Sequence, residues 1–173
     1  VLDFTHNHLA TRTRGDVPHI SAIWHDPYIM ETNTPAQNVV ALSWWQAERF
    51  TDKTGQTARL LDSICADPEV YRFDPSVPID NGRYIAIGIV DPRKGHLTAA
   101  ELALEMGVGL DIVGPPHDKD YTWYLEEICR NHPNSDIVFH GEVDLETKLA
   151  LLRRAKALLY PVGFPEGYGE AHS

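Results

Sequence analysis

Residues 83–95 read RYIAIGIVDPRKG. The run 83–90 is almost continuously apolar, which is typical of a parallel strand buried on both of its faces. Asp91, Pro92 and Gly95 then provide turn chemistry, so the chain leaves the strand in a short loop. A buried strand that leads through a loop into a helix begins a βαβ unit, and the stretch therefore predicts an α/β fold.

The same alternation of strands and helices extends in both directions along the chain. Ser43 with Gln46 and Thr98 with Glu101 have capping-box spacing, and Gly107 is placed to end the second helix. The expected strands are 1–5, 18–24, 38–42, 57–64, 109–113, 136–140 and 156–160, and the expected helices are 44–50, 98–106, 120–130 and 144–156. Right-handed crossovers between such elements give parallel, Rossmann-like sheets.

Composition restricts the classes of function. The 173 residues are 43% hydrophobic, enough to bury a core, and the formal net charge of −10 argues against nucleic acid or anionic membrane as the main partner. No apolar run approaches the ~20 residues of a membrane helix, so no membrane span is expected. Cys65 and Cys129 have no metal-type spacing and favour a reducing compartment, so a cytoplasmic location is expected.

Several strings, in order, resemble one enzyme superfamily. Besides 83–95 they are THNH (5–8), HISAIWHDP (19–27), VVALSWWQAERF (39–50), DPEVYRF (67–73), LDIVGP (110–115), IVFHGEVDLETKLALLRRAKALLYP (137–161) and PEGYG (165–169). Together they resemble the retaining GT-B-fold glycosyltransferases of the glycogen-synthase-like and mannosyltransferase-like (group 1) superfamily. The ordered set covers almost the whole chain.

The resemblance implies parts of two Rossmann-like lobes that are joined by the proline-rich connector 66–82. Residues 1–78 would be the later part of an N-terminal, acceptor-side lobe, and 79–173 the first part of a C-terminal lobe for the nucleotide-sugar donor. The implied reaction moves a hexose from a nucleoside-diphosphate sugar to an acceptor hydroxyl of unknown identity. The resemblance also implies that the enzyme needs no cofactor and no catalytic metal.

The resemblance also implies donor-binding residues at the carboxyl ends of the strands, where open α/β sheets bind ligands. Lys94, with Arg93, would neutralise the diphosphate, although DPRKG also makes an ordinary solvated turn. Glycines would allow close backbone approach, although tight βα turns explain them as well. The implied donor-binding residues are Arg93, Lys94, Gly114, Gly141, Gly167, Tyr168 and Gly169.

Two further residues would lie at the reacting centre. His25 follows the strand 18–24 and matches a strand-end histidine of the superfamily, near the reacting end of the sugar. Glu166 matches the first glutamate of an E-x₇-E motif, whose second glutamate would fall one position beyond Ser173. The resemblance therefore makes His25 and Glu166 the candidate catalytic residues.

One position departs from the superfamily pattern. The superfamily has an arginine after the strand glycine, whereas here Ile89 follows Gly88. Either Arg93 compensates for the missing arginine, or diphosphate binding is weakened. This departure and the missing second glutamate favour an alternative function, a nucleotide-sugar-binding lobe without catalysis.

A second alternative is a metal-dependent hydrolase. His6 and His8 share one strand face by the i, i+2 rule, and His25-Asp26 is the nearest pair that could complete a metal site. Trp44 is a candidate of a different kind, because an exposed tryptophan could stack on a sugar, although a tryptophan at a helix start more often packs in the core.

The chain begins at Val1 and stops at Ser173, and both ends are expected to be cut positions within a longer protein. Sheets that lack outer strands expose edges, so we expect self-association through these edges. We also expect the 173-residue chain by itself to transfer sugar poorly. His140 has no assigned role, and Arg153 and Arg154 are expected on a solvated face.

Overall fold

A computed structural model describes residues 21–23, 38–61, 66–80 and 82–163. The described residues fall into two compact units, one that ends at Ala66 and one that begins at Asp67. The division between them lies at the start of the proline-rich connector.

The first unit contains a three-stranded parallel sheet in the order β1-β2-β3, built from Ser21–Ile23, Val39–Ala41 and Arg59–Leu60. Helix α2 (Trp44–Thr54) follows β2. Phe50 and Ala47 of α2 pack with Ile23, Val39, Ala41 and Ala58 in the core of this unit. The predicted strand 57–64 is thus only two residues long in the described part.

The start of α2 confirms half of the predicted capping box. The Ser43 hydroxyl accepts a hydrogen bond from the backbone N–H of Gln46, at 3.3 Å. The buried Gln46 amide does not reach back to Ser43, because its Oε1 accepts from the N–H of Leu42 instead, at 2.9 Å. Trp44, at 72% exposure, lies outside the core.

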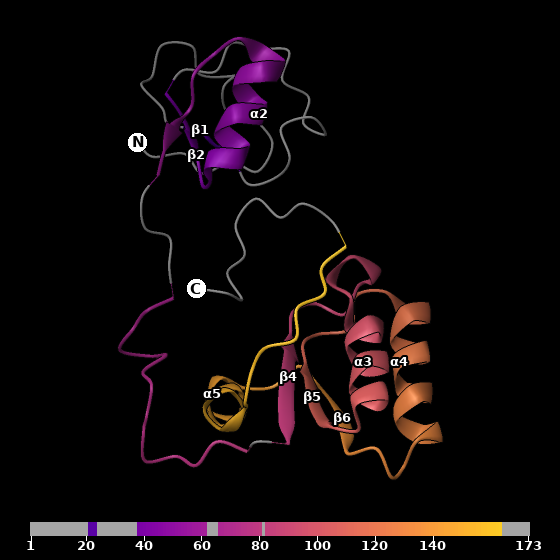
Figure 1. Cartoon of the computed structure of the whole chain (residues 1–173). Coiled ribbons are helices and arrows are strands. Elements are labelled where there is room, and N and C mark those ends of the chain that lie inside the picture. Colours follow the sequence, from indigo (N-terminus) through magenta and orange to yellow (C-terminus); the bar gives the residue numbers. More distant parts are fainter. Residues whose placement is uncertain (1–20, 24–37, 62–65, 81, 164–173) are drawn as a thin grey trace. The chain divides into compact units, whose positions relative to one another are not determined.

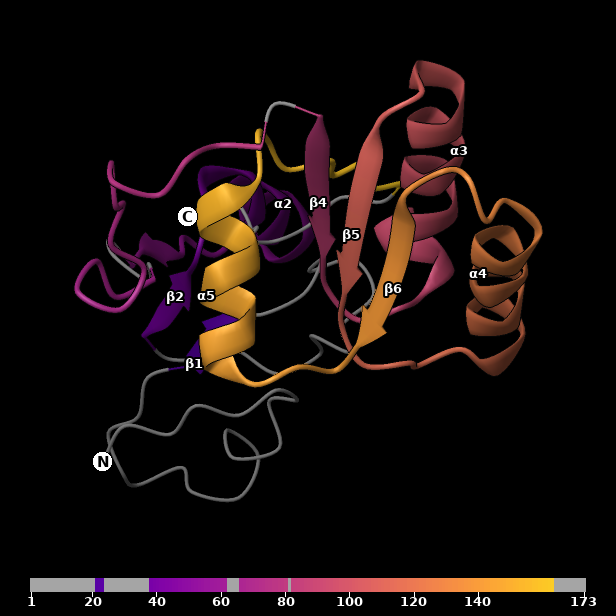
Figure 2. The ribbon, with the colours of Figure 1, turned by 90° about the horizontal axis from the view of Figure 1, so that it is seen from below.

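The second unit contains a larger parallel sheet in the order β4-β5-β6 (Figure 2). The strands are Arg83–Ile87, Gly109–Val113 and Ile137–Gly141. A short 3₁₀ helix, η1 (Pro92–Lys94), and the helices α3 (His96–Met106), α4 (Lys119–Asn131) and α5 (Leu145–Arg154) connect and follow them (Figure 1). This is the Rossmann-like α/β arrangement that the sequence predicts.

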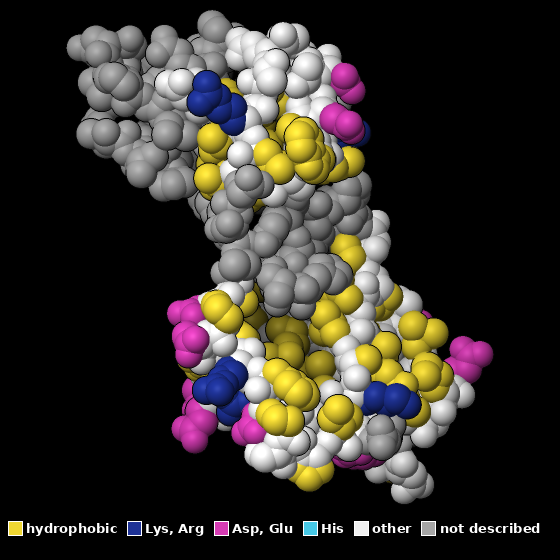
Figure 3. Space-filling view, turned by 60° about the vertical axis from the view of Figure 1, so that its left-hand side comes forward, with side chains coloured by type: hydrophobic (Ala, Val, Ile, Leu, Met, Phe, Trp, Pro, Cys, Tyr) yellow, Lys and Arg dark blue, Asp and Glu magenta, His cyan; other side chains and the backbone are white. Residues whose placement is uncertain are grey.

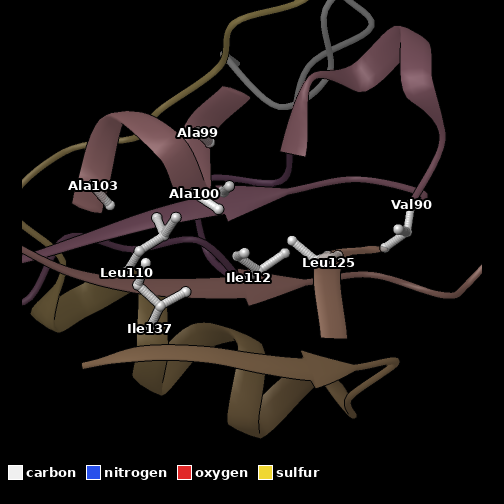
Figure 4. Close-up of a cluster of buried hydrophobic side chains, with 9 residues drawn as sticks. Val90, Ala99, Ala100, Ala103, Leu110, Ile112, Leu125 and Ile137 are labelled. Carbon is white, nitrogen blue, oxygen red and sulfur yellow. The ribbon is translucent and has the colours of Figure 1, made fainter. Parts of the chain in front are cut away.

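Alternate residues of the strands pack against helices on opposite faces of this sheet. Ala86, Leu110 and Ile112 form a core with three alanines of α3 and with Leu125 of α4, as Figure 4 shows for most of these side chains. Ile85 and Val113 point to the other face and pack on Leu151 of α5. The sheet is therefore covered on both faces, which explains why 83–90 is nearly continuously apolar.

The predicted start of the helix after 83–95 is wrong by two residues. The helix begins at His96, and its N-cap is Gly95 at φ +73°, so Thr98 and Glu101 do not form a cap. The N–H of Leu97, in the first turn, donates to the Tyr121 hydroxyl of α4 at 2.9 Å. A distant residue thus supplies the hydrogen bond that a local cap would have made, while Gly107 ends the helix as predicted.

The segment after α5 pairs with β4 on the side opposite β5. Ile85 donates to the carbonyl of Ala157 at 3.1 Å, and Leu159 donates to the carbonyl of Ile85 at 2.8 Å. The pairing is parallel but consists of isolated bridges, so the strand predicted at 156–160 is only partly formed. The chain moves outward from β4 to β6 and then returns to the other side of β4, which makes β4 a topological switch point.

A buried carboxylate holds the α5 face of the sheet together. Asp111 accepts two hydrogen bonds from Arg83, at 2.7 and 2.9 Å, one from Arg154 at 3.1 Å, and lies 2.7 Å from Nε2 of His140. Burial alone would raise the pKa of Asp111, but these partners, Arg83 first, lower it to about 2. Arg153 is exposed as expected, whereas the Arg154 side chain is only 43% exposed because its guanidinium bonds to Asp111. His140, which had no assigned role, has a structural partner in Asp111.

Candidate functional site

Three glycines end the three strands of the second unit on the same edge of the sheet. Gly88, Gly114 and Gly141 have φ values of +145°, +155° and +68° and follow or close β4, β5 and β6. Gly88 donates to the carbonyl of Val113 at 3.0 Å, and Gly114 donates to the carbonyl of Gly141 at 2.8 Å. They form a connected row at the carboxyl edge, where open α/β sheets bind their ligands.

Gly114 cannot carry a side chain at its position. A Cβ on Gly114 would lie 1.7 Å from the carbonyl oxygen of Gly88, closer than any non-bonded contact allows. The backbones of the first two strand ends therefore touch directly. The absence of a side chain at Gly114 thus makes room for the neighbouring strand end, whereas a Cβ on Gly141 would meet nothing within 4 Å, so the edge is open at Gly141.

Lys94 lies beside this row of glycines. The Cδ atom of Lys94 is 4.0 Å from the position that a Cβ on Gly88 would take. Its ammonium group lies over the ring of Tyr160, 6.0 Å from the ring centroid. Tyr160 belongs to the segment after α5 that returns to β4. Lys94, which follows β4, therefore lies between the strand-end glycines and this returning segment.

Glycine also allows the returning segment to lie against the loop before α3. A Cβ on Gly95 would be 2.1 Å from the carbonyl oxygen of Pro161. Gly163 donates to the carbonyl of Arg93 at 3.1 Å. Residues 160–163 are thus fixed to the loop that carries Arg93 and Lys94.

Arg93 is paired within its own loop. Its guanidinium donates to both carboxylate oxygens of Asp91, at 2.8 and 2.9 Å, and His117 Nδ1 lies 3.2 Å from the same carboxylate. The hydrogen bond from Arg93, which outweighs burial, holds the pKa of Asp91 far below its usual range. Asp91 thus balances the charge of Arg93, which weakens the expectation that Arg93 compensates for the arginine that Ile89 replaces.

Sequence reasoning missed two residues at this edge. His96 follows Gly95 directly, is 2% exposed, and has an Nδ1 atom that is buried without a hydrogen-bond partner. The 96, 99, 100, 103 spacing of buried residues in α3 would have assigned it to the sheet side of the helix. Tyr160 could have been found because it ends the strand predicted at 156–160.

The structure brings Lys94, Gly114 and Gly141 to one edge, with Arg93 in the adjoining loop. The other predicted site residues lie outside the described residues: His25, Glu166, Gly167, Tyr168 and Gly169. His6, His8 and Asp26 of the hydrolase alternative lie outside them as well. Among the residues that the structure describes, no group of three His, Cys, Asp or Glu side chains could hold a metal ion.

On the face shown in Figure 3, the Lys and Arg side chains of the described residues stand apart and form no continuous basic surface. In the part of the chain that the structure describes, no helix has the length and apolarity to cross a membrane.

Solved structures similar to this chain are glycosyltransferases. AviGT4, a glycosyltransferase involved in avilamycin A biosynthesis, is 28% identical over 82% of this chain and 39% of its own, with a TM-score of 0.61. HepE of Anabaena, solved with UDP and glucose, is 17% identical over 89% of this chain and 49% of its own, with a TM-score of 0.73. The pneumococcal O-GlcNAc transferase GtfA, solved with UDP and GlcNAc, is 15% identical over 98% and 38%, with a TM-score of 0.68.

The chain spans less than half the length of each of these three proteins. No family model and no curated protein matches it. The resemblance that the ordered sequence strings suggested is nevertheless confirmed in three dimensions, with one three-stranded parallel sheet in each unit. The chain therefore has the fold of the GT-B glycosyltransferases.

Proposed function

We propose that this chain is part of a glycosyltransferase that moves a hexose from a nucleoside-diphosphate sugar to an acceptor hydroxyl, with retention at the anomeric carbon. In the overall reaction, the bond from the anomeric carbon to the diphosphate breaks and a bond to the acceptor oxygen forms. The diphosphate leaves with the bonding electron pair, and the acceptor hydroxyl loses its proton.

The observation that carries the proposal is the row of Gly88, Gly114 and Gly141 beside Lys94 at the switch point. Main-chain groups on an edge without side chains allow a diphosphate to approach closely, and a lysine there opposes the charge that develops on it. Because the chain is acidic, it has to bind a diphosphate through local groups of this kind and not through a broad basic surface.

The remaining roles come from the resemblance. His25 would lie near the reacting centre, and Glu166 with Gly167, Tyr168 and Gly169 would hold the ribose or the sugar. The donor would bind the second unit and the acceptor the first. UDP is present in two of the three similar structures described above, and UDP is therefore the first donor nucleotide to test, ahead of GDP and ADP.

Calorimetry with UDP, GDP and ADP tests the proposal. We expect one of the three to bind the wild-type chain and Lys94→Met to weaken that binding about tenfold or more, as expected for the loss of a charge-assisted hydrogen bond. Lys156→Met is the matched control. It removes the same charge next to Arg83, at the other end of β4, so it should leave the dissociation constant within about twofold. No binding by any of the three nucleotides would refute the proposal.

A second candidate function is nucleotide-sugar binding without catalysis. It is favoured by Ile89, which presents an apolar, 37% exposed side chain where the superfamily has an arginine, and by the pairing of Arg93 with Asp91. Binding of a nucleotide sugar without release of free nucleotide, with water or with a panel of acceptor sugars, would select this candidate. Cytoplasmic location and self-association through sheet edges stay predictions.

A further inference from the structure

His96 is a polar residue in an apolar position. It lies on the buried face of α3 in line with Ala99, Ala100 and Ala103, and its Nδ1 has no hydrogen-bond partner. A buried polar group without a partner costs about 1–3 kcal/mol relative to a satisfied one. An apolar side chain of similar size would avoid this cost, so the structural setting alone does not explain a histidine here.

The ring of His96 lies at the candidate phosphate edge. Its Cε1 atom, which lies between the two ring nitrogens, is 4.0 Å from the position that a Cβ on Gly88 would take. The Cδ atom of Lys94 lies at the same 4.0 Å from that position. The imidazole and the lysine therefore flank the turn that ends β4.

The surroundings determine which partner the ring can accept. Burial first, and then the positive charge of Lys94, lower the pKa of His96 to about 4, with Asp91 opposing this shift. The imidazole is therefore neutral at pH 7 and carries one N–H donor and one acceptor nitrogen. The N-terminus of α3 and the Lys94 ammonium both favour an anion at this place, so the missing partner is an acceptor and the ring is the donor.

We propose that His96 is a donor-binding residue whose neutral imidazole N–H hydrogen-bonds a phosphate oxygen of the nucleoside diphosphate that Lys94 attracts. The inference rests on the proposed function, because it names a further group in the same site. Nδ1 is shielded from solvent without a ligand, so the Gly88 turn and the Lys94 side chain adjust when the diphosphate binds.

The test compares three variants by calorimetry with UDP, GDP and ADP and by urea unfolding. His96→Leu removes both ring nitrogens and fills the position with an apolar side chain. His96→Asn restores an N–H donor near the position of Nδ1, and His96→Gln restores one near the position of Nε2. We expect His96→Leu to bind the preferred nucleotide about tenfold more weakly while it unfolds at an equal or higher urea concentration. Of the two amide variants, we expect His96→Asn to recover most of the affinity.

Spectroscopy adds a readout that a purely structural role would not change. In the wild-type chain with ¹⁵N-labelled histidine, the preferred nucleoside diphosphate should shift the His96 ring nitrogens, and uridine, guanosine or adenosine should not. Wild-type binding together with unchanged affinity in His96→Leu would overturn the inference and leave the proposed function standing. Lower stability of His96→Leu with no change in the ring nitrogens would also overturn it. If no nucleotide binds the wild-type chain, the proposed function fails and the inference fails with it.

Discussion

Gly114→Ala is the substitution that the structure predicts to be most damaging at the carboxyl edge of the second unit. The new Cβ would lie 1.7 Å from the Gly88 carbonyl oxygen, whereas close carbon–oxygen contacts begin at about 3.3 Å. One of the two strand ends would have to move by roughly 1.5 Å. The hydrogen bonds Gly88 to Val113 and Gly114 to Gly141 oppose that movement.

The magnitude follows from two contributions. Forcing extra volume into a packed position costs about 1–3 kcal/mol, and a non-glycine residue at a φ of +155° adds about 1–3 kcal/mol of backbone strain. We therefore expect Gly114→Ala to lower the free energy of unfolding of the second unit by about 4 kcal/mol. At an m-value of about 2 kcal/mol/M, the urea midpoint falls by about 2 M.

Gly141→Ala is the matched control. Gly141 also has a positive φ, of +68°, but a Cβ there would meet nothing within 4 Å. Only the left-handed backbone penalty of about 1–2 kcal/mol applies to it. Hydrogen exchange of the β4 and β5 amides, read by mass spectrometry across a urea series, reports the second unit separately from the first. A Gly114→Ala midpoint within about 0.5 M of that of Gly141→Ala would refute the steric reasoning.

Three further predictions concern the same unit. Asp111→Asn removes the buried counter-charge of Arg83 and Arg154, although Asp136 still pairs with Arg83, and should cost about 3 kcal/mol at pH 7 in the same urea assay. Because the folded pKa of Asp111 is about 2 and the unfolded value is about 3.9, the carboxylate stabilises the fold fully above pH 4. The stability gap between wild type and Asp111→Asn should therefore close as the pH falls from 4 towards 2, and a gap that stays constant would contradict the network. Gly95→Ala places a Cβ 2.1 Å from the Pro161 carbonyl oxygen, so it should expose residues 160–163 to hydrogen exchange. It should also weaken nucleotide binding, and the free-energy loss in binding should exceed the free-energy loss in unfolding that the urea midpoint reports. Ile89→Arg should strengthen binding of the preferred nucleoside diphosphate severalfold by calorimetry, since Ile89 is partly exposed and can be replaced without loss of core packing.

The sequence predicted the parts of the fold that depend on local pattern. The apolar run 83–90, the glycine at 107 and the helix-length spacing of the second half led to the correct strands and helices within a few residues. Lys94 and the strand-end glycines were also placed correctly on one edge, because the ends of parallel strands in one sheet must meet there.

The sequence could not reveal features that depend on contacts between distant residues. The cap of α3 comes from Tyr121, 24 positions after Leu97, and so the local signal at Thr98 was misleading. The partners of Asp111 come from β4, β6 and the end of α5, and nothing in the local sequence links Arg154 to a buried carboxylate. Asp91 and Arg93 are two positions apart, so the sequence allowed an ion pair between them, but only the geometry of the loop determines that the pair forms.

The central claim is that the glycine row at the carboxyl edge of the second unit binds a nucleoside diphosphate. Titration of the ¹⁵N-labelled chain with UDP, GDP and ADP, followed by two-dimensional NMR, tests it most directly. We predict that one nucleotide shifts the amide signals of Gly88, Gly95, Gly114 and Gly141, while the signals of Gly55 and Gly107, which end helices α2 and α3, do not shift. Shifts centred on Gly55 or Gly107, or no shift with any of the three nucleotides, would contradict it.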